Sequence, residues 1–167
     1  MVEYRAFFTT YDGITDELTT PVIIRPLYTT DTAFRGISFE VEALWDTGAT
    51  DTCVKPTLWE RLKLRPLEFG RKQFTGIGGN VTADLTFVNL LLTPKLEIVC
   101  SPVYITDFPG DADMLIGMDI IGLGDFIVCN ANNKTSFSFA IPPFPDRINL
   151  ADKAEIANKL NQTESST

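Results

Sequence analysis

The residues best suited to chemistry form a short acidic turn, Asp46-Thr47-Gly48-Ala49, that directly follows an apolar run. A carboxylate at this place requires an explanation, because burying a charge is costly. Gly48 allows a tight turn that holds the acid, and the Thr47 hydroxyl can hydrogen-bond locally or across an interface. A D-T-G triplet by itself usually marks an ordinary turn. Its place after a buried strand makes Asp46 the leading candidate for a catalytic acid or base.

The amino-acid composition further limits the catalytic mechanisms that the chain can use. The 167-residue chain contains no histidine, which excludes Ser-His-Asp and Cys-His mechanisms and most zinc sites. Carboxylates therefore remain the leading catalytic groups. The three cysteines, Cys53, Cys100 and Cys129, are widely spaced and contain no C-x-x-C pair. This pattern is typical of reduced, unpaired thiols in a reducing compartment.

Two glycine-containing segments are further candidates. Gly76, Ile77, Gly78 and Gly79 lie between two strand-like runs, and a flexible glycine tip can close over a ligand as lids do. An ordinary hairpin turn explains the same residues equally simply. The second segment, Leu115-Ile116-Gly117, has the pattern of a core strand that ends in a glycine turn.

The elements that must position these residues are mostly strands. Much of the chain alternates with period two and is rich in Val, Ile, Thr and Phe. The pattern predicts strands at residues 4–10, 21–28, 36–45 and 90–104, and hairpins at 74–89 and 126–141, while residues 113–121 are apolar apart from Asp119. The second strand has proline at both ends, which favours an edge or a loop passage, and the strand at 90–104 is expected to break at Pro94 and Pro102.

Two helices are also expected. Residues 56–64 have an apolar face with Pro56 in the first turn, and residues 149–160 carry Leu150, Ala154, Ala157 and Leu160 on one stripe. The polar residues after 160 are expected to be disordered. The chain therefore divides into an all-β domain at residues 1–145, in which 9–35 has no clear place, and a C-terminal helix with its tail at 146–167.

The chain resembles the retropepsin-like aspartic proteases in the order and spacing of four segments: the D-T-G-A turn, the short helix, the G-I-G-G hairpin and the apolar-apolar-Gly segment. The resemblance covers residues 36–141 and is closer to the cellular and bacterial branch than to the retroviral one. It implies a closed acid-protease β-barrel with one short helix. It also implies an aspartic endopeptidase that cleaves peptides or proteins, without a cofactor.

The resemblance further implies a role for each motif. Only one D-T-G occurs in the chain, so the enzyme would be a homodimer in which two copies of Asp46 share a proton and activate a water. In such proteins the residue at Thr47 bonds across the dimer and Gly48 accepts a hydrogen bond from the substrate backbone. The flap near Ile77 holds the peptide, and residues 115–117 pack beneath the turn.

Two residues depart from the retroviral pattern. Thr50 stands where retroviral enzymes have a second Asp, and Met118 stands where they have the Arg that binds it. The two losses fit together, because removing one partner of a charged pair removes the pressure to keep the other.

The sequence offers weaker support for several other functions. The net charge of −8 disfavours nucleic-acid partners and anionic membranes. No membrane-spanning run or signal sequence occurs, which predicts a cytoplasmic protein. An EF-hand starting at Asp111 fails because Leu115 and Ile116 stand at its fifth and sixth positions. A phosphate loop fails because Val81 replaces its third glycine. A sugar hydrolase is a weaker alternative, and an inactive peptide-binding or dimerisation module is the principal one.

Overall fold

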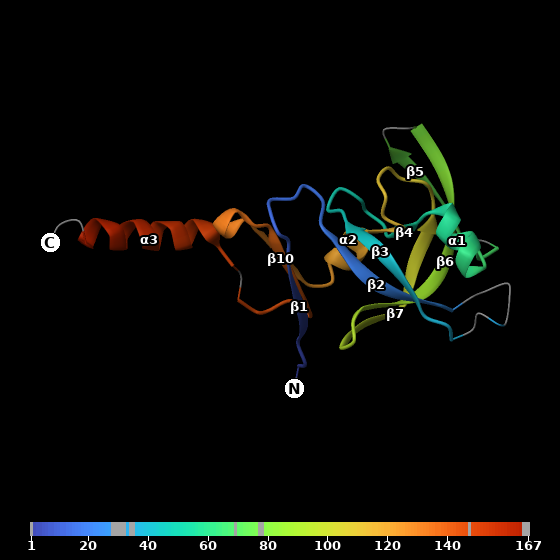
Figure 1. Ribbon diagram of the computed structural model, residues 1–167, viewed down its shortest axis with the longest axis horizontal. Helices are drawn as coiled ribbons and strands as arrows, with labels where there is room; N and C mark the ends of the chain where they lie inside the picture. The colour runs from blue at the N-terminus through green and yellow to red at the C-terminus, as the bar shows by residue number, and fades with distance from the viewer. Residues whose placement is uncertain are drawn as a thin grey trace.

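The computed structural model describes residues 2–27, 33, 36–68, 70–76, 79–146 and 148–164. Its elements follow in chain order (Figure 1). They are β1 Arg5–Thr10, β2 Thr19–Pro26, β3 Phe39–Trp45, β4 Cys53–Val54, α1 Pro56–Leu62, β5 Arg71–Gly76, β6 Gly79–Thr93, β7 Leu96–Ile105, β8 Met114–Ile116, α2 Met118–Ile121, β9 Asp125–Cys129, the 3₁₀ turn η2 Ala131–Asn133, β10 Ser136–Ile141 and α3 Leu150–Glu164.

The main body is a closed β-barrel. Its strands run in the order β2-β3-β8-β4-β7-β6, and β6 pairs again with β2 to close the ring, while β5 lies outside it on β6. β3 and β8 are parallel, so the residues that follow both strands emerge at the same end of the barrel. This confirms the expected all-β barrel and brings residue 46 next to residue 117.

The interpretation of residues 21–28 as an edge strand or loop was wrong. β2 pairs with β3 on one side and with β6 on the other, and it is therefore the strand that closes the barrel. Pairing with β6 covers only Ile23 to Pro26, so Pro21 lies outside the doubly paired stretch. Proline is tolerated there because its missing N–H removes no bond from the central ladder.

The barrel interior is filled by aliphatic side chains, including Ile24, Leu90 and Ile116, which are fully buried. β3 shows how the alternating pattern produces this core. Val41, Ala43 and Trp45 point inward and are buried, whereas Glu40 and Glu42 are exposed. The period of two places alternate side chains on opposite faces of a strand.

A second, smaller sheet with the order β1-β10-β9 covers one end of the barrel. Phe7, Phe137 and Phe139 on its inner face surround the Trp45 ring at centroid distances of 5.7, 5.5 and 5.1 Å. This aromatic cluster joins the sheet to the last residue of β3. The N-terminal strand of residues 4–10, left without a partner by the sequence, therefore supports the residue that precedes Asp46.

The structure differs from the sequence-based elements at three places. Pro102 does not break its strand, since it lies within β7 opposite Phe87, and the break falls only at Pro94. The body contains a second short helix, the four-residue α2, in addition to the expected α1. The C-terminal helix continues to Glu164, so residues 161–164, expected to be disordered, are helical.

The C-terminal helix α3 projects away from the body and has the C-terminus at its far end (Figure 1). Every side chain from Leu150 to Asn161 is exposed. In the part of the chain that the structure describes, no helix combines the length and apolar character needed to cross a membrane.

Candidate active site

The acidic turn begins where β3 ends. The backbone N–H of Asp46 donates to the carbonyl of Ile116 at 3.0 Å, which ties the start of the turn to the parallel strand β8. The Ala49 N–H donates back to the Asp46 carbonyl at 3.2 Å and closes the turn. Asp46 is half-buried, while Thr47 and Gly48 are exposed. The turn therefore presents its three residues at the surface from a fixed base.

The Asp46 carboxylate has a defined orientation. Its Oδ1 accepts a hydrogen bond from the Gly48 N–H at 2.8 Å. A Cβ atom on residue 48 would come within 3.1 Å of the same oxygen, so a side chain there would crowd the carboxylate. Glycine at this position leaves the carboxylate uncrowded. One carboxylate oxygen is thus held by the turn itself.

The expected supporting residues lie under this turn. Leu115 and Ile116 are buried in β8, which pairs in parallel with β3 and antiparallel with β4. Gly117 follows them, and a Cβ atom on it would lie 2.6 Å from the carbonyl carbon of Asp51. Only glycine allows the two chain segments to approach this closely. Leu115, Ile116 and Gly117 thus lie against the chain segment that carries the acidic turn.

A buried hydrogen-bond network, which the motif analysis missed, clamps the two segments together. Thr52 is completely buried, and its hydroxyl accepts from the Gly117 N–H at 3.1 Å while donating to Asp119 Oδ1 at 2.7 Å. The Thr52 N–H donates to Asp119 Oδ2 at 3.1 Å. Backbone bonds from Met118 to Ala49 (2.8 Å) and from Asp119 to Thr50 (3.2 Å) extend the clamp. It holds both ends of the loop that follows Asp46.

The loop is also joined to the β5–β6 hairpin by an ion pair. Lys72 Nζ on β5 donates to Asp51 Oδ1 at 2.7 Å and to Oδ2 at 2.6 Å. The Thr50 hydroxyl also donates to Oδ2, at 2.6 Å. The ammonium group lies 5.3 Å from the Phe74 ring centroid and 5.5 Å from that of Tyr104. These cation–π contacts hold the lysine over a fixed aromatic surface.

The charges around the pair shift both pKa values. Burial raises the pKa of Asp51, but hydrogen bonds from Lys72 and Thr50 and the lysine charge outweigh it and bring the pKa below its ordinary value. The hydrogen bond to Asp51 raises the pKa of Lys72. Both groups are therefore charged at neutral pH. One feature of the sequence points to this ion pair. Asp51 directly follows Thr50, which stands where retroviral enzymes have an acid.

The nearby Cys53 thiol is held in its protonated form. It is buried, and burial together with the charges of Asp51 and Asp119 raises its pKa to about 12. A thiol that stays protonated is a poor nucleophile. Cys100 and Cys129 are exposed on the surface, and none of the three cysteines forms a disulfide.

The β5–β6 hairpin has the register expected for the glycine tip. Gly76 at the end of β5 lies opposite Gly79 at the start of β6. Ile77 and Gly78, which the sequence assigns to the tip of the flap, lie outside the described residues. Among the residues that are described, no group of three or more acidic or cysteine side chains is placed to hold a metal ion.

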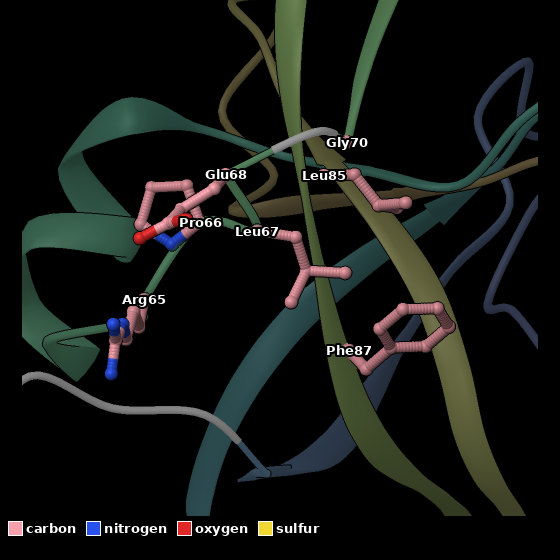
Figure 2. Close-up of a pocket in the computed structure, with 7 residues that line it drawn as sticks. All are labelled: Arg65, Pro66, Leu67, Glu68, Gly70, Leu85 and Phe87. Carbon is pink, nitrogen blue, oxygen red and sulfur yellow. The ribbon is translucent and has the colours of Figure 1, made fainter.

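A separate hollow of about 620 Å³ lies between the loop after α1 and strand β6 (Figure 2). Leu67, Leu85 and Phe87 line its floor, and Arg65 and Glu68 stand at its rim. None of the residues predicted for catalysis lines it. The acidic turn and this hollow are therefore distinct features of the surface.

Comparison with known families gives one match. The model of the aspartyl protease family matches residues 32–120, which include the acidic turn, the β5–β6 hairpin and the segment through Gly117. No protein among curated sequences matches this chain.

Solved structures show the same likeness. The EIAV protease complexed with the inhibitor HBY-793 is 26% identical and has a TM-score of 0.50, with 68% of this chain and 92% of that chain covered. A retropepsin-like aspartic protease from Rickettsia conorii is 12% identical and has a TM-score of 0.52, with 84% of this chain and 98% of that chain covered. The second likeness extends over almost the whole fold of that protein.

Proposed function

The chain belongs to the aspartyl protease family, and from this premise we propose that it is an aspartic endopeptidase whose catalytic pair consists of Asp46 from each of two copies. The supporting observation is that the neighbouring carboxylates already have hydrogen-bond or ion-pair partners. Asp51 is bound by Lys72 and Thr50, and Asp119 is bound by Thr52. Neither is available as a partner for Asp46. This supports a second carboxylate supplied by a second copy, across a two-fold axis.

The chemistry follows from placing two such carboxylates together. Like charges at close range cannot both ionise, so the pair holds one proton. The ionised carboxylate takes a proton from a bound water, and the protonated one polarises the scissile carbonyl. Asp46 suits this role because the Gly48 N–H holds one oxygen and leaves the other available. Aspartic proteases in general work by this sharing of a proton.

The substrate class follows from the surrounding elements. An extended peptide bound between the turn and the hairpin would pair its main chain in the manner of an added strand. Thr47 is exposed, as a hydroxyl that bonds across a dimer must be. The Gly76–Gly79 tip would cover the peptide and shield the dyad and its bound water from bulk solvent.

The test is cleavage of a peptide library by the wild type, Asp46→Asn and a matched control, Asp16→Asn, which changes an exposed acid on the loop between β1 and β2. We expect Asp46→Asn to abolish cleavage, because a neutral amide cannot act as a base, and Asp16→Asn to retain it. Wild-type cleavage by Asp46→Asn between pH 3 and 8 would exclude the aspartic mechanism. Peptide binding without cleavage by the wild type would favour the inactive module instead.

Mixing experiments test the dimeric dyad. Adding an equal amount of Asp46→Asn to the wild type and allowing exchange should lower activity to about half, because mixed dimers lack one carboxylate. Unchanged activity after exchange, with the native mass measured in parallel, would show that one chain supplies the whole site.

A further inference from the structure

The small sheet β1-β10-β9 has an apolar outer face in addition to the inner face that covers Trp45. Phe8 and Ile127 on that outer face, with Phe144 and Ile148 from the following segment, line a groove of about 600 Å³, hereafter the outer groove. Phe8 is 70% exposed and Ile148 is 58% exposed. Contiguous apolar surface of this kind marks a site of association.

Helix α3 exposes a complementary apolar stripe. Leu150 is 73% exposed, Ile156 59% and Leu160 61%. A 15-residue helix without tertiary packing is marginal in water, because most helical stability in proteins comes from burying an apolar face. We therefore expect another surface to cover the apolar stripe.

The charges of the two surfaces also match. Lys153 lies on the stripe, three residues after Leu150 and seven before Leu160. The outer groove carries two carboxylates, Asp125 and Asp146, along its lining. The other lysine of the helix, Lys159, is paired with Glu155 at 2.7 Å. The stripe thus offers a cation to an acidic, apolar groove.

The geometry at the start of α3 argues against docking within one chain. Ile148 lines the groove, and the helix begins two residues later. Asn149 caps the helix, since its Oδ1 accepts from the Ala151 N–H at 3.0 Å and its carbonyl accepts from the Lys153 N–H at 3.2 Å. Ile148 and the capping residue Asn149 thus join α3 directly to the groove lining, and α3 runs away from the sheet (Figure 1).

We propose that the outer groove is the docking site for α3 of a second copy, so that two chains exchange their C-terminal helices as reciprocal straps. The arrangement is isologous, with each groove receiving the partner's helix. It buries both apolar surfaces at once and sets Lys153 beside Asp125 and Asp146. It is separate from the catalytic proposal and holds whether or not the protein cleaves peptides.

Cross-linking between two distinguishable chains tests the strap. Both chains carry Cys100→Ser, Cys129→Ser and Asp46→Asn, so that neither surface thiols nor cleavage interfere. One chain also carries Ser138→Cys in the outer groove, and the other carries Ile156→Cys on the stripe of α3. Mild oxidation of the mixture should give a cross-linked heterodimer. The matched control, Asn158→Cys, lies two residues after Ile156 and therefore on the opposite side of α3, and it should give at most a tenth as much, taken as an order-of-magnitude margin for side-chain reach.

Three outcomes would overturn the proposal. They are a heterodimer yield equal to that of the Asn158→Cys control, no heterodimer at all, or an intrachain cross-link at high dilution when both cysteines are placed in one chain. The last would assign the groove to the chain's own helix.

Charge reversal gives a second measurement. Lys153→Glu should weaken the dimer on the order of tenfold in sedimentation, because it sets a carboxylate against two others. Asp146→Lys in the same chain should restore part of the loss. A dissociation constant that neither change alters would refute the strap.

Discussion

Replacing Asp119 by alanine removes the carboxylate that clamps the loop after Asp46 to the segment after Gly117. The side chain accepts from the Thr52 hydroxyl, from the Thr52 N–H and from the Ile120 N–H, at 2.7, 3.1 and 3.0 Å. The Ile120 N–H has a second acceptor in the Gly117 carbonyl at 3.1 Å. The two Thr52 donors, which lose their acceptor, therefore account for most of the lost stability.

The expected cost follows from the burial of Thr52, which is complete. A buried donor left without a partner costs about 1–3 kcal/mol, so two of them predict a loss of roughly 2–4 kcal/mol in the free energy of unfolding, allowing for rotation of the hydroxyl. Asp119→Asn keeps one acceptor oxygen and should cost roughly half as much. The clamp holds the turn that we propose to be catalytic, so kcat should fall more than KM changes.

Urea denaturation at one fixed protein concentration measures the stability, because the concentration of a dimer affects it. The matched control is Asp113→Ala, whose carboxylate makes only a partly exposed ion pair with Arg61 at 3.8 Å and should cost less than about 1 kcal/mol. Equal stability losses for Asp119→Ala and Asp113→Ala would refute the clamp. Full recovery of kcat in Asp119→Asn and a loss in Asp119→Ala would support positioning through hydrogen bonds.

Two further predictions concern titratable groups. Lys72→Met should cost about 0.5 kcal/mol at neutral pH, since the lysine is largely exposed. Because the pKa of Asp51 is lowered from 3.8 and that of Lys72 raised from 10.5, this stability is present between those values and is lost as pH falls through the lowered pKa or rises through the raised one. Urea unfolding should therefore show a wild-type advantage at pH 6 that shrinks below pH 3; a constant difference would contradict the pair. Cys53, with its pKa raised to about 12, should resist maleimide at pH 8 while Cys100 and Cys129 react, as mass spectrometry can check; rapid labelling of Cys53 in the folded protein would show that the thiol is accessible.

Local pattern was enough for most of the elements. The alternation in β3, the proline at the start of α1 and the glycines between β5 and β6 each depend on neighbouring residues, and all three elements occur at the expected places. The family followed from the order of the motifs. A D-T-G turn, a glycine hairpin and an apolar-apolar-Gly segment are informative together because their spacing reflects one chain path.

Long-range pairing could not be predicted in the same way. β2 was misjudged because its prolines suggest an edge, whereas the closure of the barrel depends on where β6 lies in space. Asp119 was read only as a polar interruption of an apolar run. Its partner, Thr52, lies 67 residues away in the chain, and the antiparallel pairing of β4 with β8 brings the two together.

The sequence by itself determined which groups can do chemistry, because the absence of histidine and the position of Asp46 after an apolar strand are properties of composition and local order. The tertiary structure decided which carboxylates remain available. Asp51 lies close to Asp46 in the sequence, and Asp119 lies close to the Leu115-Ile116-Gly117 motif. Each is nevertheless bound by a residue from another segment, Asp51 by Lys72 and Asp119 by Thr52. Hydrogen bonds between distant segments depend on the folded path of the chain, and no local pattern encodes that path.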